Sequence, residues 1–168
     1  MDGQSWINSL PADAGSGRDQ MVLDAVSSGL AVVNFVPVTS SVDGHSATFQ
    51  VCDDAVYVPA DDGSRFRFQV TAKMNQQCAD ALGAIMVTAK VMDLSYQQAT
   101  TMVDCCVLTA GPAMSSTDYS VRWNKMVEDK RNGATGLFRD CGKAWILDNA
   151  LAGSAGAVNY GFYAKDAL

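Results

Sequence analysis

The sequence has few of the side chains that usually transfer protons. It contains one histidine, His45, and one glutamate, Glu128, among 168 residues. General acid–base catalysis most often uses histidine, with carboxylates, lysine, tyrosine and cysteine as alternatives. Aspartate, cysteine and lysine remain, so the catalytic repertoire is small rather than empty. This scarcity favours a non-catalytic protein.

Recognisable cofactor patterns are missing as well. The cysteines are five in number, no two have the CxxC spacing, and only one histidine accompanies them. A structural zinc site needs four thiolate or imidazole ligands at characteristic spacings. The chain also has no glycine-rich phosphate loop, no HExxH and no GxSxG motif. We therefore expect no cofactor, and we expect buried, reduced thiols.

Long apolar runs and clusters of positive charge are also absent from the sequence. The longest apolar stretch, residues 29–38, is much shorter than the roughly 20 residues that span a bilayer. Residues 1–4 do not have the pattern of a signal peptide. We therefore expect cytoplasmic synthesis, a virus particle as one destination, and no membrane contact. The net charge of −6 disfavours nucleic acid, because binding phosphates requires clustered cations.

The hydrophobic pattern changes from period two to a helical period and back. Strand patterns occupy residues 31–39, 47–51, 55–58, 65–70, 143–147 and 157–163, and helical patterns occupy 73–85, 88–106 and 115–132. This order predicts an α+β fold in which an antiparallel sheet of N- and C-terminal strands packs against about three central helices. We expect an irregular arm over residues 1–19 and a single domain over residues 20–168.

Capping and turn residues mark the ends of these predicted elements. Thr88 is the expected N-cap of the second central helix, and Ser115 or Ser116 that of the third. Residues 132–133 (NG) are expected to end the third helix. Residues 53–54 (DD) are expected to turn a hairpin between 47–51 and 55–58.

Cys141 is the first candidate nucleophile, because Arg139 and Lys143 flank it. Nearby cations lower the pKa of a thiol and favour the reactive thiolate. His45 would have to act as its base, although a position beside the turn residues 43–44 also suits a solvated histidine. Lys143 and Asn149 would be supporting polar groups.

A serine–lysine pair is a second catalytic arrangement. Ser115 or Ser116 would be the nucleophile, with Lys90 or Lys143 as a desolvated base. Helix capping explains both serines with fewer assumptions.

Two further sets of residues are candidates for binding. The candidate calcium ligands are Asp53, Asp54, Asp61 and Asp62, with Asp43 nearby. They lack the spacing of a twelve-residue calcium loop, and turn formation explains them equally. The candidate ligand platform consists of Trp145, Tyr160, Phe162 and Tyr163, for which core packing is the alternative.

Four short segments carry a resemblance to a known group. They are residues 88–93 (TAKVMD), 111–114 (GPAM), 143–151 (KAWILDNAL) and 159–162 (NYGF). In this order they resemble a poorly characterised group of bacterial and phage-borne proteins. In that group a PTxKMxD helix start precedes a KxWxLxNxL strand and an NYGWH or IYGWH strand. The resemblance covers about residues 48–163 and supports the predicted domain boundaries.

The chain departs from this group at its histidines. Many members have His–Lys–Lys–Asp where this chain has residues 141–144 (CGKA), and the last motif ends here in Tyr163 instead of histidine. If those histidines form a hydrolytic site in the group, this chain lacks most of it. Our leading hypothesis is a non-catalytic structural or binding module with protein partners in an assembly such as a phage particle. The alternative is a small cell-wall or polysaccharide hydrolase that uses Cys141 or a pair of aspartates.

Overall fold

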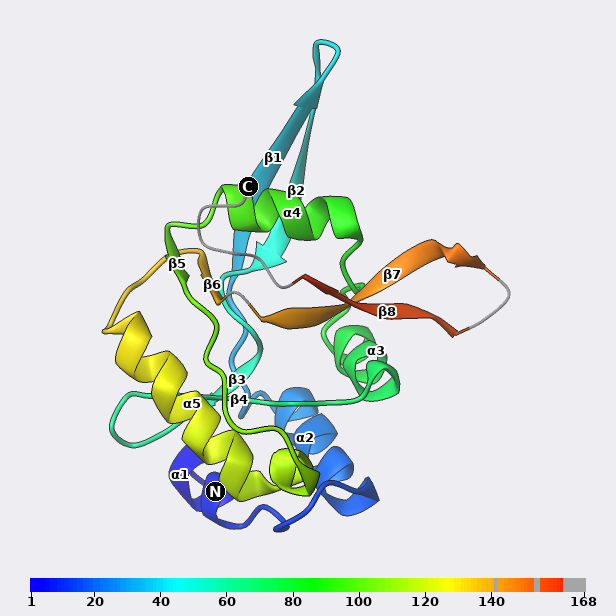
Figure 1. Cartoon of the computed structure of the whole chain (residues 1–168). Coiled ribbons are helices and arrows are strands. Elements are labelled where there is room, and N and C mark those ends of the chain that lie inside the picture. The colour runs from blue at the N-terminus through cyan, green and yellow to red at the C-terminus, as the bar shows by residue number, and fades with distance from the viewer. Residues whose placement is uncertain (141, 153–154, 162–168) are drawn as a thin grey trace. The chain divides into compact units, whose positions relative to one another are not determined.

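The computed structural model describes residues 1–140, 142–152 and 155–161 (Figure 1). The chain gathers into two compact units, each built from three segments. Unit 1 consists of Met1–Val33, Ala55–Ile85 and Cys106–Asn132, and unit 2 consists of Asn34–Asp54, Met86–Cys105 and Gly133–Leu168. The sequence predicts one domain over residues 20–168, whereas the chain passes back and forth between two units.

Unit 1 is mainly helical. It contains α1 (Gly3–Asn8), α2 (Ser16–Ser27), β3 (Tyr57–Pro59), β4 (Arg65–Arg67), α3 (Ala72–Ala81), the short 3-10 helix η1 (Pro112–Ser115) and α5 (Thr117–Arg131). β3 and β4 form an antiparallel hairpin. α2 packs against α3, and α5 packs against β4.

The expectation of an irregular arm over residues 1–19 is wrong, because α1 and the start of α2 lie there. The carboxylate of Asp2 caps α1 by accepting a hydrogen bond from the backbone N–H of Ser5 at 2.7 Å. Trp6 is only 5% exposed and packs edge-on against Phe66 and Phe68. The N-terminal segment is therefore part of the core of unit 1.

A close backbone approach also fixes α1 in place. Gly3 is buried, and a Cβ atom at this position would overlap the carbonyl oxygen of Pro59 in β3. Only glycine allows the helix to approach the strand so closely.

A buried ionic network joins β4 to α5. The backbone N–H of Arg67 donates to Asn124 at 2.8 Å, and the Asn124 amide donates back to the Arg67 carbonyl at 3.0 Å. The guanidinium of Arg67 donates to Glu128 at 2.8 Å, and Arg131 donates to the other oxygen of the same carboxylate at 2.8 Å. Charge-assisted hydrogen bonds of this kind hold a short strand that pairs with β3 alone among the described strands.

Unit 2 contains most of the strands. They are β1 (Phe35–Val42), β2 (His45–Cys52), β5 (Thr101–Val103), β6 (Phe138–Asp140), β7 (Lys143–Ala152) and β8 (Ala155–Gly161), with one helix, α4 (Ala89–Gln97). The α+β class is confirmed. The prediction of one antiparallel sheet is wrong. The strands of the described residues pair two by two, and the β5–β6 pair is parallel. Pairing between chain neighbours, as in β1–β2 and β7–β8, costs less loop entropy than a sheet joining both ends of the chain.

The turn expected at residues 43–44 is confirmed, whereas the hairpin turn predicted at residues 53–54 is wrong. β1 pairs with β2 around Asp43 and Gly44, and both have positive φ values, 51° and 77°. Such values suit a two-residue type I′ turn, which favours the Asp-Gly sequence. Residues 53–54, the predicted turn, instead follow the end of β2.

The predicted helix caps are confirmed at several positions. The hydroxyls of Thr88 and Ser116 accept hydrogen bonds from the first turns of α4 and α5. Asn132 ends α5 in the left-handed conformation, with φ of 48°. α4 ends at Gln97 rather than near Cys106, because residues 101–103 pair with β6. Within the described residues, no helix is long and apolar enough to cross a membrane.

We predict that Glu128→Gln destabilises the protein by about 2–3 kcal/mol, because it leaves the guanidinium of Arg67, 3% exposed, without its charged partner. Burial by itself raises the pKa of Glu128, but hydrogen bonds from Arg131 and Arg67 and their positive charges outweigh it and lower the pKa below the ordinary 4.5. The stabilisation is therefore complete above pH 4.5 and is lost as the pH falls through the lowered value.

Urea unfolding of the wild type and the variant between pH 3 and pH 7 tests this prediction. The difference in unfolding free energy should be largest near neutral pH and shrink below pH 4.5. Asp129→Asn is the matched control on the same helix, because its pair with Lys125 is exposed, and its effect should stay within about 0.5 kcal/mol. Equal effects of the two variants would contradict the structural role of the network.

Candidate functional site

The predicted catalytic residues are not brought together within the described part of the chain. Cys141 lies outside the described residues. His45 begins β2 beside the turn and is exposed. Lys143 begins β7 and is exposed, and Asn149 lies further along the same strand. The Cys141 hypothesis therefore stays a prediction.

The four aspartates predicted as metal ligands belong to two different units. Asp53 and Asp54 are buried in unit 2, with exposures of 8% and 4%. Asp61 and Asp62 lie in the turn between β3 and β4 of unit 1. The side chain and backbone of Ser64 donate hydrogen bonds that lower the pKa of Asp62. No three histidine, cysteine or acidic side chains among the described residues are placed to hold a metal ion.

The predicted aromatic platform is divided between the two faces of the β7–β8 hairpin. Trp145 pairs with Asn159, whereas Tyr160 pairs with Ala144. Because side chains alternate along a strand, Trp145 and Tyr160 point to opposite faces. Phe162 and Tyr163 lie outside the described residues. The Tyr160 hydroxyl donates to both carboxylate oxygens of Asp93 on α4, at 3.0 and 3.2 Å, so it has a structural role in linking hairpin and helix.

Among the described residues of unit 2, a group of polar side chains surrounds Arg139 on β6. The three guanidinium nitrogens donate to the Ser95 hydroxyl at 3.0 Å, to the Phe138 carbonyl at 2.7 Å and to the Cys52 carbonyl at 2.8 Å. Burial lowers the pKa of Arg139, and the nearby Tyr96, Cys52, Asp54 and Asp140 oppose this shift. The guanidinium therefore joins the end of β2, α4 and β6. We call these residues, Cys52, Asp54, Ser95, Tyr96, Arg139 and Asp140, the Arg139 cluster.

The Arg139 cluster has the chemistry of a structural junction. The Tyr96 hydroxyl donates to the carbonyls of Asp140 at 2.6 Å and Gly142 at 3.2 Å. Burial raises the pKa of the Cys52 thiol, an effect that the Arg139 charge only partly offsets. Cys52 is therefore held as the protonated, weakly nucleophilic thiol.

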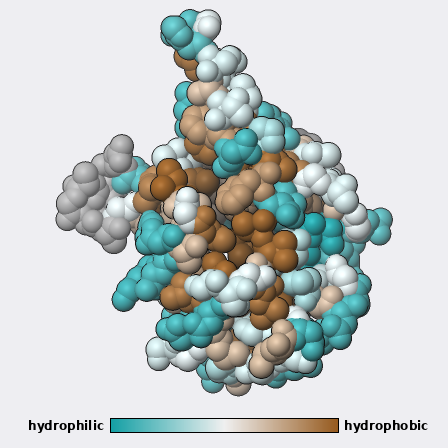
Figure 2. Space-filling model, turned by 180° about the vertical axis from the view of Figure 1, so that it is seen from behind, coloured by the Kyte–Doolittle hydropathy of each residue, from teal (hydrophilic) through white to brown (hydrophobic). Residues whose placement is uncertain are grey.

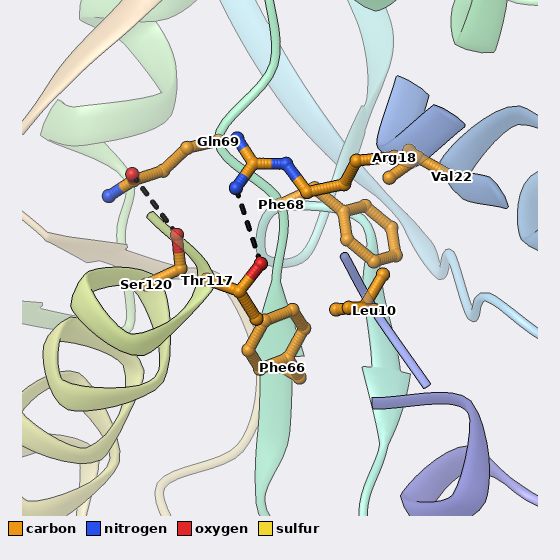
Figure 3. A pocket seen from close by; sticks show the side chains of 8 residues that line it. All are labelled: Leu10, Arg18, Val22, Phe66, Phe68, Gln69, Thr117 and Ser120. Carbon is orange, nitrogen blue, oxygen red and sulfur yellow. Dashed lines mark hydrogen bonds between the residues drawn. The ribbon is translucent and has the colours of Figure 1, made fainter. Parts of the chain in front are cut away.

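Unit 1 has a small pocket, which Figure 3 shows from close by. It is lined by Leu10, Arg18, Val22, Phe66, Phe68, Gln69, Thr117 and Ser120. The guanidinium of Arg18 donates to the carbonyl of Ser115 at 2.8 Å and to the Thr117 hydroxyl at 3.4 Å. The cavity volume is about 20 Å³, room for roughly one water molecule. Ligand pockets usually measure about 300–1,000 Å³, so this pocket is a packing defect rather than a substrate site.

The outer half of the β1–β2 hairpin is exposed to solvent. Residues 41–50 are all exposed, and they include the turn and most of β2. One face of the hairpin carries five apolar side chains besides Ala47, Ser40 and His45: Val36, Val38, Val42, Phe49 and Val51. Its inner residues, Val38 at 0% and Val51 at 4%, pack with Leu137, whereas Phe49 at 39% and Val42 at 52% are open to solvent. Figure 2 shows this hairpin at the top of the view, with brown residues among white and teal ones.

The opposite face of the hairpin carries small hydroxyl side chains. Thr39 and Thr48 are hydrogen-bonded across the strands at 3.0 Å, and Ser41 and Ser46 at 2.8 Å. The hairpin is thus rigidified by its own cross-strand pairs while it presents one apolar and one polar surface. No sequence pattern singles it out, because its alternation is that of any half-buried strand.

Comparison with known protein families, curated proteins and solved structures finds no match for this chain. The resemblance to the group with PTxKMxD and NYGWH motifs therefore stays a prediction. The geometry of the hairpin and of the Arg139 cluster is the only basis for a function.

We predict that Cys52 reacts slowly with iodoacetamide in the folded protein at pH 8, because its raised pKa keeps it protonated. Residue-resolved mass spectrometry of the alkylated peptides measures the rate in the native protein and in urea. The rate should rise clearly on unfolding, where burial no longer raises the pKa. Equal rates in both states would contradict the burial of the thiol beside Arg139.

Proposed function

We propose that this chain is a non-catalytic binding module that works as a component of a larger protein assembly, such as a phage particle. The observation that carries this proposal is the exposed outer half of the β1–β2 hairpin. The face that bears the buried Val38 also bears Phe49, directly opposite it, and Val42 beside the turn, with Ser40 and His45 on the same face. A contiguous exposed apolar patch on an ordered element marks a protein contact surface, and Phe49 and Val42 share one face of this hairpin.

The energetics of a two-stranded arm support the same proposal. An isolated hairpin is only marginally stable in water, and residues 41–50 are all exposed. Ordering these residues costs roughly 1–2 kcal/mol of backbone entropy each, while Phe49 and Val42 keep 39% and 52% of their surface exposed. A partner that covers Phe49 and Val42 supplies the missing burial.

The polar residues of unit 2 also favour binding over chemistry. Arg139 donates all of its described hydrogen bonds to two backbone carbonyls and the Ser95 hydroxyl. The Cys52 thiol is kept protonated by burial. These groups stabilise the base from which the hairpin extends.

We predict that the full chain binds at least one product of its neighbouring genes through the hairpin. Each purified product is the probe in a biolayer interferometry assay with immobilised full-length chain. The double variant Val42→Thr, Phe49→Ser should weaken this binding at least about tenfold, because losing the burial of two apolar side chains costs more than roughly 1.4 kcal/mol.

Ile85→Ser is the control for this experiment. Ile85 is 79% exposed and lies in unit 1, away from the hairpin in sequence, so its replacement should leave binding unchanged. Circular dichroism should report the same helix content and melting temperature for all variants. A chain that binds none of these products and does not associate with itself would refute the proposal.

A further inference from the structure

The two long edges of the β1–β2 hairpin expose different backbone groups. Val42 pairs with His45 across the two-residue turn, and hydrogen-bonded pairs alternate with non-hydrogen-bonded pairs from there inward. The backbone groups that face away from the partner strand belong to Phe35, Pro37, Thr39 and Ser41 on β1 and to Ser46, Thr48, Gln50 and Cys52 on β2. These two sets decide where a further strand can be added.

The outer edge of β1 is closed at its centre. Pro37 has no backbone N–H to offer. Gln98 is the C-cap residue that follows α4, and its side-chain amide both donates to and accepts from the backbone of Thr39, as a neighbouring strand would. The Thr39 N–H donates to Gln98 Oε1 at 3.0 Å, and Gln98 Nε2 donates to the Thr39 carbonyl at 2.8 Å. An incoming strand would have to displace this amide.

The outer edge of β2 is open. Ser46, Thr48 and Gln50 are exposed, and among the described residues nothing is hydrogen-bonded to their outward backbone groups. Natural sheets usually protect such an edge with proline, lysine or a bulge. Residues 46–51 (SATFQV) contain no proline and no charge, and their pairing with β1 is regular. This edge therefore lacks the common devices against pairing.

We propose that two copies of this chain pair along β2, antiparallel and centred on Thr48, to form one four-stranded sheet. The inference rests on the proposed function, since it names the partner of the same hairpin. A twofold axis at Thr48 places Ser46 opposite Gln50 of the second copy and Thr48 opposite its own counterpart. All three residues direct their backbone N–H and C=O groups outward. In this register each residue therefore donates a hydrogen bond to the opposite residue of the second copy and accepts one from it.

The side chains of the two copies match across this seam. Ala47 comes to lie beside Phe49 of the second copy on the apolar face, and the hydroxyl and amide side chains meet on the polar face. The chain carries a net charge of −6, yet the seam opposes no like charges, because residues 46–50 are uncharged. Asp43, in the turn, lies beyond the paired segment.

The asymmetry of the hairpin edges limits the association to two copies. After β2 has paired with β2, only the β1 edges face outward, and Pro37 and Gln98 close both of them. The contact is isologous, so it makes a closed pair rather than a filament. A five-residue seam is much smaller than the standard interface of about 1,600 Å², so we expect a dissociation constant on the order of 10–100 μM.

Sedimentation velocity of the full chain, over about 1 to 500 μM, tests the pairing. The wild type should shift from monomer to dimer in this range. Thr48→Pro should remain monomeric, because it removes an outward N–H and leaves the hydrogen bonds to β1 intact. Thr48→Val, which keeps the N–H, is the matched control and should dimerise like the wild type. A wild type that stays monomeric at the highest concentration would overturn the inference.

Disulfide trapping tests the register without depending on the proline variant. Opposite residues of a hydrogen-bonded antiparallel pair have Cα atoms about 5.5 Å apart, within the range that a disulfide spans. Thr48→Cys should therefore give a covalent dimer under mild oxidation. Ser46→Cys should not, because its symmetric copies are four residues out of line, about 14 Å apart. The wild type controls for the native cysteines, and crosslinking of Ser46→Cys instead of Thr48→Cys would refute the register.

The outcomes separate this inference from the proposed function. If the wild type stays monomeric and yet binds a neighbouring gene product through Val42 and Phe49, the pairing of two copies fails and the binding module stands. If it neither pairs nor binds, both fail.

Discussion

The two-stranded sheet is the constraint on which the rest of this structure depends. Two paired strands alone bury too little apolar surface to be stable. Each strand pair in the described residues therefore needs contacts with side chains from other elements. In unit 1, Asn124 and Glu128 on α5 hold β4. In unit 2, Arg139 holds the end of β2 against α4 and β6. Polar side chains with fixed hydrogen-bond geometry replace the neighbouring strands that a larger sheet would provide.

This support shows which parts of the fold the sequence could predict. Helices with local signals were predictable, since Thr88 and Ser116 cap them and Asn132 ends α5. Strand pairs between distant segments were not predictable, because no local pattern indicates a pair such as β5 with β6. The turn predicted at residues 53–54 was wrong for a related reason. Residues 53–54 have turn composition, but burial beside Arg139 outweighs local preference there.

The candidate site was harder to predict than the fold. An arginine close to a cysteine in the sequence suggests an activated thiol. Arg139 is two residues from Cys141, so the sequence suggested this role for it. In the structure its described bonds run to Cys52, Ser95 and Phe138, which no local pattern indicates. The exposed hairpin was equally hidden. Val42 and Phe49 continue the same alternation as the buried Val38 and Val51, and only the extent of the core distinguishes them.

The interleaving of the two units has a consequence for how the chain is made. Residues of unit 1 occur on both sides of residues of unit 2, up to Asn132. A ribosome must therefore release α5 before unit 1 has all of its segments, and β6 before the Arg139 cluster can form. Such non-local closure slows folding and leaves apolar surface uncovered in the nascent chain. Early segments of unit 1 therefore lack the packing that α5 supplies until translation has passed Asn132.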